Sequence, residues 1–228
     1  MQPYFFPYIG YFQLINAVDE FVIYDNIEFV KKGWINRNRI LVNGIDEYIS
    51  LPLKKDSDYL HVKDRLLADM WDIERKKMLN RITESYRKAP YFKETYEVLE
   101  KCIMFEDRNL FKFILHSVQI LLQYLNIDTK LVVSSFIPID HQLKSDEKVM
   151  AICKERGANI YINPIGGLEL YNKERFSVHN IELQFQKANY ITYTQFNNEF
   201  IPWLSIIDVM MFNDIESIKE KISLYTLI

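Results

Sequence analysis

Short apolar runs alternate along the chain with longer segments in which apolar residues recur every three or four positions. The runs at 21–25, 131–134 and 160–163 have the length and composition of buried strands. Helical patterns flank each of them, as expected when helices cover both faces of a parallel sheet. The pattern therefore predicts a Rossmann-like three-layer α/β domain in which these runs are parallel strands of one sheet.

An Asn-Gly dipeptide at 43–44 separates two further strand-like runs, 39–42 and 48–51. Both residues tolerate positive φ angles, so this dipeptide favours the two-residue turn of a β-hairpin. We expect residues 40–42 to pair with the region 47–49.

Three amphipathic segments follow one another between about residues 61 and 126. They lie at 71–86, 90–102 and 107–125, and Asp107 has the chemistry of a helix cap. We interpret them as a helical insertion within a single domain spanning residues 1–228. Shorter helices are predicted at 11–17, 145–157, 168–176, 202–213 and the C-terminal end, with a strand at 181–185.

Composition narrows the class of protein. The chain has 228 residues, 49% hydrophobic and 26% charged, which is typical of a globular domain. A net charge of −3 gives no basic field and argues against nucleic acid as a partner. No apolar run approaches the roughly 20 residues of a membrane span and no leader pattern is visible, so we expect a cytoplasmic protein. Cys102 and Cys153 lack metal-ligand spacing and are expected to be free thiols.

Candidate chemistry concentrates near the start of the chain. Residues 2–11 contain two prolines, a glycine and five aromatic residues, and a cationic loop with amide side chains and Trp34 follows at 31–39. Arginine forks and lysine charges suit a phosphate or diphosphate, and a tryptophan suits stacking on a base or sugar ring. The alternatives are that the aromatic residues pack the edge of the sheet and that 31–39 is an ordinary solvated loop.

These motifs resemble those of the WbqC-like proteins of bacterial surface-polysaccharide gene clusters. That family's pattern has an opening Gln-Pro, a Pro-x-x-Gly-Tyr, an aspartate that ends the next strand and a Trp-x-Asn-Arg. The corresponding positions here are 2–3, 7–11, 25 and 34–37, with further likeness at 86–92, 134–135, 157–161 and 204–208. In the family the Gln-Pro ends a first, central strand, so we expect a strand to belong ahead of Gln2.

The loop at 7–11 also resembles the HIGH-type loop of nucleotidyltransferases and pantothenate-synthetase-like ligases. Such a loop holds nucleotide phosphates at a helix N-terminus, where free N–H groups and the helix dipole favour anions. Tyr11 stands where the last histidine of that motif would be, and the loop contains no histidine. We therefore expect a nucleotide-binding scaffold without the usual imidazole chemistry.

The resemblance implies an enzyme of O-antigen or related glycan assembly that acts on a nucleotide-linked amino sugar, by N-acyl or aminoacyl transfer. Its co-substrate would be a nucleotide or an activated acyl donor, and the scattered histidines predict no metal site. Asp25 or His141 would deprotonate the amine, and Arg37, Lys32 or a loop N–H would stabilise the oxyanion. The candidate substrate-binding residues are Gln2, Tyr8, Gly10, Tyr11, Lys31, Lys32, Trp34, Asn36, Ser134, Gly166, Gly167, Tyr171, Ser205 and Asp208.

Other readings of the same residues stay open. Ser205 precedes Asp208 by three positions, which also fits a helix N-cap. Because no nucleophile is recognisable, a non-catalytic protein that binds a nucleotide sugar or an acyl carrier is the alternative function, and a structural partner with aromatic interfaces is a third. For the enzyme and for the binding protein we expect a phosphate-bearing small molecule as the partner. A homodimer is also compatible with the sequence.

Overall fold

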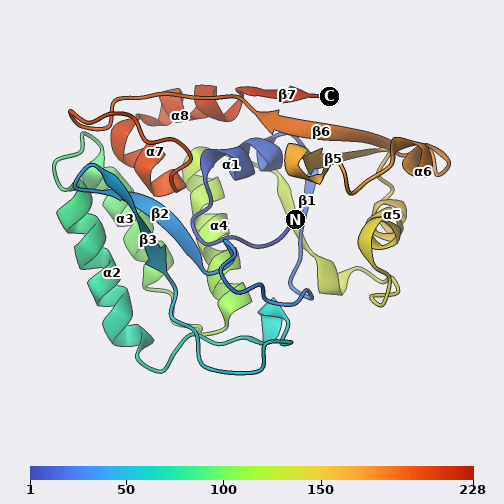
Figure 1. Cartoon of the computed structure of the whole chain (residues 1–228), viewed down its shortest axis with the longest axis horizontal. Coiled ribbons are helices and arrows are strands. Elements are labelled where there is room, and N and C mark those ends of the chain that lie inside the picture. Colours follow the sequence, from blue (N-terminus) through green and yellow to red (C-terminus); the bar gives the residue numbers. More distant parts are fainter.

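The computed structural model describes residues 1–228 as eight α-helices and seven strands in three small sheets (Figure 1). The helices are α1 (Ile9–Asn16), α2 (Trp71–Tyr86), α3 (Phe92–Ile103), α4 (Leu110–Leu125), α5 (Ser145–Glu155), α6 (Lys173–Ser177), α7 (Ile206–Phe212) and α8 (Ile215–Ile222). The strands are β1 (Glu20–Ile23), β2 (Arg37–Val42), β3 (Ile45–Ser50), β4 (Lys130–Val133), β5 (Ile160–Pro164), β6 (Glu182–Ala188) and β7 (Tyr225–Leu227). The mixed α/β class predicted from the sequence is confirmed.

The three predicted parallel strands do not share one sheet. β1 and β4 are parallel neighbours, with Phe21 opposite Leu131 and Ile23 opposite Val133. β5 instead pairs in parallel with β6, which pairs antiparallel with β7 on its other edge. The prediction of a single sheet was therefore wrong, because the run at 160–163 lies in a different sheet.

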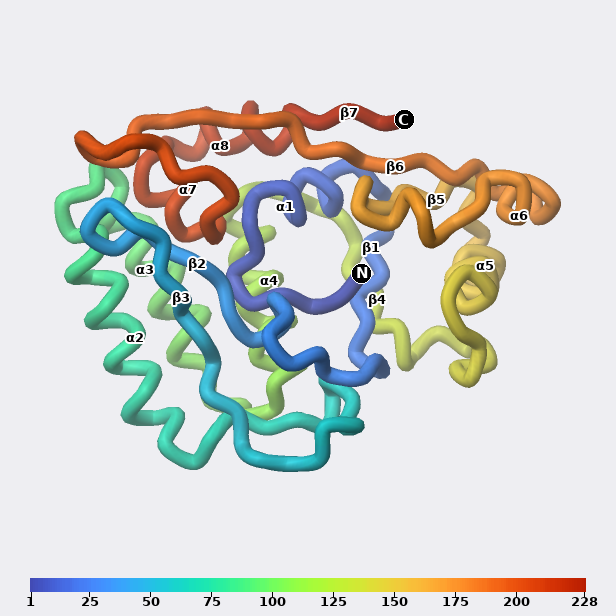
Figure 2. The backbone as a smooth tube through the Cα atoms, viewed as in Figure 1, coloured from blue at the N-terminus to red at the C-terminus, as the bar shows by residue number.

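Met1 occupies the edge of β1 that β4 leaves open. Its amino group donates to the carbonyl of Val22 over 2.7 Å, and the Tyr24 N–H donates to the Met1 carbonyl over 2.8 Å. This is the bonding pattern of a parallel ladder, so Met1 pairs with the second edge of β1 beside Ile23. Figure 2 shows the first residues running from that position across to the start of α1.

The Asn-Gly hairpin is confirmed. Asn43 and Gly44 have φ angles of 50° and 82° and join β2 to β3 as a two-residue turn. The register differs slightly from the expected one, because β3 begins directly after the turn: Val42 lies opposite Ile45 and Ile40 lies opposite Glu47.

The predicted helical region forms α2, α3 and α4 and contributes to the main hydrophobic core. Phe113 of α4 packs in this core against Trp71 and Phe5, with ring centroids 5.3 and 6.4 Å away. The N-cap of α4 is Asn109 rather than the expected Asp107, since the Asn109 side chain accepts from the Lys112 N–H. A second, smaller core lies between α5, α6 and β6. No helix combines the length and apolar character required to span a bilayer.

Candidate functional site

The carboxyl ends of β1 and β4 bring Asp25 and Ser134 together. Ser134 Oγ lies 2.9 Å from Asp25 Oδ1, and the Ser135 N–H donates to the same oxygen over 2.9 Å. Asp25 is only 3% exposed, and its second oxygen, Oδ2, accepts no hydrogen bond within the chain. Since ligands of parallel α/β sheets gather at the carboxyl edge, the free carboxylate oxygen marks a candidate contact point.

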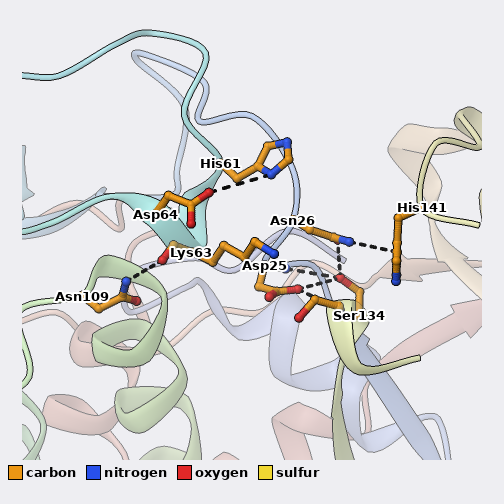
Figure 3. A network of polar contacts seen from close by, with 9 residues as sticks. Asp25, Asn26, His61, Lys63, Asp64, Asn109, Ser134 and His141 are labelled. Atoms are coloured by element: carbon orange, nitrogen blue, oxygen red, sulfur yellow. Dashed lines mark hydrogen bonds and ion pairs between the residues drawn. The ribbon is translucent and has the colours of Figure 1, made fainter. Parts of the chain in front are cut away.

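Asn26 extends this polar network to His141 (Figure 3). Asn26 Oδ1 lies 2.6 Å from Ser134 Oγ, and Asn26 Nδ2 lies 3.0 Å from His141 Nδ1. With Asn26 Nδ2 donating to it, Nδ1 is the acceptor, and the tautomer that fits this contact carries its proton on Nε2. The network thus leaves one ring N–H of His141 available to a ligand.

Two lysines add positive charge to this edge. Lys63 lies in the 3-10 turn Val62–Asp64, and its side chain points toward Asp25 in Figure 3. Lys148 lies on α5, with Nζ 5.6 Å from the ring centroid of Tyr24. Burial lowers the pKa of Lys148, while Asp25 raises it and Lys63 lowers it further.

The glycine pair predicted to contact substrate follows β5. A Cβ on Gly167 would lie 1.8 Å from Asn163 Nδ2, whereas Gly166 has open space around it. Tyr171 packs nearby, with its ring centroid 5.9 Å from that of Tyr161. The pKa of Tyr24, beside Asp25, is raised by burial and further by Tyr171, so this region borders the Asp25 network.

The opening loop builds a different part of the molecule. Tyr11 is buried, and its hydroxyl donates to the Gln2 carbonyl over 3.0 Å. The Tyr8 ring covers Gly10 so closely that a Cβ there would lie 2.3 Å from it. Tyr8 also forms a β-bridge with Ser205, so these residues position α1 against the segment before α7.

The cationic loop is bound mainly to itself and to the hairpin. Arg37 Nε donates to the Gly33 carbonyl over 3.1 Å, and a second guanidinium nitrogen donates to the Lys32 carbonyl. The guanidinium carbon lies 4.5 Å from the Tyr48 ring centroid, and Asn36 Nδ2 donates to the Leu51 carbonyl. The structure therefore gives Asn36 and Arg37 no contact with the Asp25 network.

Two other predicted residues of this loop lie at the surface. Lys31 forms an ion pair with Asp58 over 2.7 Å, and Trp34 is 39% exposed.

Ser205 and Asp208 are buried in the framework. Ser205 Oγ donates to the Phe6 carbonyl and caps α7 by accepting from the Ile207 N–H, as the capping alternative proposed. Asp208 accepts from the hydroxyls of Tyr86 and Tyr193 over 2.8 and 2.7 Å. With both carboxylate oxygens engaged and no exposure, this side chain is not part of the candidate site.

Among the sequence-predicted residues, the structure thus brings together Asp25, Ser134 and His141. Sequence reasoning missed Asn26, Lys63 and Lys148. Asn26 directly follows the carboxylate at a strand end, a signal that was available, whereas nothing local distinguishes the two lysines from solvated surface residues. No group of three His, Cys, Asp or Glu side chains is arranged to hold a metal ion.

Comparison with known proteins gives a family match and a distant relative. A model of the WbqC-like protein family matches residues 2–220. The uncharacterized protein Rv1507c of Mycobacterium tuberculosis is 28% identical over 214 residues, which cover 92% of this chain and 90% of that protein. No solved structure matches the chain.

Proposed function

The chain belongs to the WbqC-like protein family, and from this premise we propose an enzyme of surface-polysaccharide assembly. It would transfer an acyl or aminoacyl group to the amine of a nucleotide-linked sugar. The observation that supports this proposal is the Asp25 network at the carboxyl ends of β1 and β4. A buried carboxylate with one free oxygen and a histidine N–H lie within one hydrogen-bonded chain there.

Asp25 is the proposed base. Its Oδ2 would accept a hydrogen bond from the sugar ammonium and then take one proton, which exposes the nitrogen lone pair. That lone pair attacks the acyl carbon, the amide C–N bond forms, and the bond to the leaving group breaks with its electron pair. The leaving group then takes the second proton released by the nitrogen, so that one proton ends on Asp25 and one on the leaving group. Ser134 and the Ser135 N–H hold the other carboxylate oxygen in place throughout.

His141 is the proposed donor to the developing oxyanion. Because Asn26 donates to Nδ1, the neutral ring offers its Nε2 proton to the acyl oxygen as charge builds there. This role differs from the base role expected from the sequence, and it replaces Arg37, whose donors serve carbonyls of its own loop.

Ligand-dependent stability tests the proposal first. Nucleotide-linked amino sugars should raise the melting temperature more than the same nucleotides without an amino sugar, since the amine contacts Asp25. Binding at 100 times the Kd adds about 2.7 kcal/mol of stability, which is easily measured. Asp25→Asn should abolish this difference, whereas the exposed Asp69→Asn should keep it. Equal stabilisation of wild type and Asp25→Asn would contradict the proposal.

The alternative, a protein that binds a nucleotide sugar or acyl carrier without catalysis, has one observation in its favour. Burial raises the pKa of Cys102 to about 12 and that of Cys153 to about 11, so neither thiol is a ready nucleophile. Mass spectrometry of the sugar after incubation with activated acyl donors separates the two functions. Binding without a new amide would favour the alternative.

A further inference from the structure

We infer that Lys63 and Lys148 form a binding site for a phosphate or diphosphate group beside Asp25. The inference rests on the proposed function only where it identifies this group as the diphosphate of the nucleotide-linked sugar. Both lysines lie outside the loops at 7–11 and 31–39, where the sequence predicts phosphate binding.

The backbone of Lys63 is held firmly on both sides. Its N–H donates to the Asp25 carbonyl over 3.0 Å, and its own carbonyl accepts from the side chain of Asn109, the N-cap of α4 (Figure 3). The preceding Val62 is fully buried and bonded to Ile27. A lysine on a fixed backbone loses less freedom on binding than one on a mobile loop.

Lys148 approaches from another element. It lies in the first turn of α5 and places its ammonium over the Tyr24 ring, next to Asp25. Asp146 and Glu147 in the same turn both lie beside Arg175, which forms an ion pair with each of them. Arg175 thus offsets one of the two acidic charges in this turn and draws both carboxylates toward itself, and the helix dipole at this end adds to the attraction for an anion.

The local charge is unbalanced. The Lys63 side chain points toward Asp25 in Figure 3, the Lys148 ammonium lies over the ring of Tyr24, which precedes Asp25, and neither lysine forms an ion pair within the chain. Burial is the main cause of the lowered pKa of Lys148, and the charge of Lys63 adds to it in the same direction. A bound phosphate relieves this repulsion, and compact ammonium charges suit its oxygens well.

Calorimetric titration with inorganic pyrophosphate tests the site directly on the full chain. We expect pyrophosphate to bind, with Lys63→Ala and Lys148→Ala each weakening it at least about tenfold. Lys144→Ala is the matched control, because Lys144 is exposed, lies just before α5 and forms no ion pair. Lys148→Arg should retain most of the affinity, and circular dichroism shows whether each variant is folded.

The outcomes separate this inference from the proposed function. Pyrophosphate binding that depends on both lysines, without any amide product from an amino sugar, would uphold the phosphate site and reject the enzyme. No binding, or equal binding by wild type and a folded Lys63→Ala/Lys148→Ala double variant, would overturn the phosphate site. The affinities of uridine and of uridine diphosphate then show whether the bound anion belongs to a nucleotide. If it does, the lysine variants should bind uridine diphosphate more weakly than wild type does and should bind uridine equally well.

Discussion

Ser134 Oγ lies 2.9 Å from Asp25 Oδ1, although the two residues are 109 positions apart in the chain. The parallel pairing of β1 with β4 creates this contact, because each residue follows its strand at the same edge. The neighbouring Ser135 contributes through its backbone N–H instead of its side chain. One carboxylate oxygen is thus held by the Ser135 N–H and by the Ser134 hydroxyl, whose single proton is shared with Asn26 Oδ1.

Because Ser134 acts through its side chain and Ser135 through its backbone, substituting each to alanine gives a paired test. Ser134→Ala removes one donor from a buried carboxylate and should cost about 1 kcal/mol of unfolding free energy, as well as weakening binding of amine ligands at Asp25. Ser135→Ala keeps the backbone donor and should change neither quantity. Urea denaturation with a ligand titration measures both. Equal effects of the two substitutions would show that the Ser134 hydroxyl does not position Asp25.

Features that depend on neighbouring residues could be predicted from the sequence, whereas features that depend on residues far apart in the chain could not. The hairpin at Asn43 and Gly44 was predictable because a turn depends on residues next to each other in the chain. The pairing of β5 with β6 was not, because the choice of partner depends on which strand edges are free. Likewise, the sequence indicates that Arg37 is a cation, but not that carbonyls of its own loop occupy its donors.

The hairpin turn should be sensitive at Gly44. Its φ of 82° lies in the left-handed region, and an added Cβ would meet Asn198 Oδ1 at 3.0 Å. Gly44→Ala should therefore cost about 1–2 kcal/mol and lower the melting temperature. Gly166→Ala is the control, since open space surrounds that glycine and its φ is not in the left-handed region. A similar melting temperature for both variants would contradict the strain assigned to Gly44.

The carboxylate of the buried Asp208 should be required for the stability of the fold. Tyr193 and Gln195 both donate to its Oδ2, over 2.7 and 2.6 Å, while Tyr86 donates to Oδ1. Asp208→Asn would replace one acceptor by an NH₂ group facing other donors, at a cost of about 1–3 kcal/mol. The exposed Asp128→Asn should be neutral by thermal denaturation. An unchanged melting temperature of Asp208→Asn would mean that the carboxylate is not needed.

Glu20 should contribute to acid unfolding. Hydrogen bonds from Arg156 and Lys130 lower the pKa of its carboxylate to about 2 in the folded state, from the usual value near 4.5. Its stabilising effect is therefore complete above pH about 4.5 and is lost as the pH falls toward 2. Because these two ion pairs lie at the surface, where solvent screens them, we expect less than about 1 kcal/mol. Glu20→Gln should flatten the pH dependence of unfolding in this window, and parallel curves for variant and wild type would refute the linkage.

The free edge of β1 offers a final test. Met1 already makes one rung of a parallel ladder there, with bonds of 2.7 and 2.8 Å to Val22 and Tyr24, and burial lowers the pKa of its amino group to about 5. An apolar, β-branched extension ahead of Met1 would add rungs beside Glu20 and Phe21 and convert the buried amine to a peptide N–H. Each buried apolar side chain is worth about 1.5–3 kcal/mol, so the melting temperature should rise by several degrees.

A Gly-Ser extension of the same length is the matched control for this experiment, because it supplies peptide groups without apolar side chains or strand propensity. It should leave the melting temperature nearly unchanged. A more ordered carboxyl edge should also strengthen ligand binding at Asp25, which directly follows Tyr24, the residue bonded to Met1. If both extensions melt and bind alike, β1 does not accept a further strand at this edge, and the strand expected ahead of Gln2 would have no place beside it.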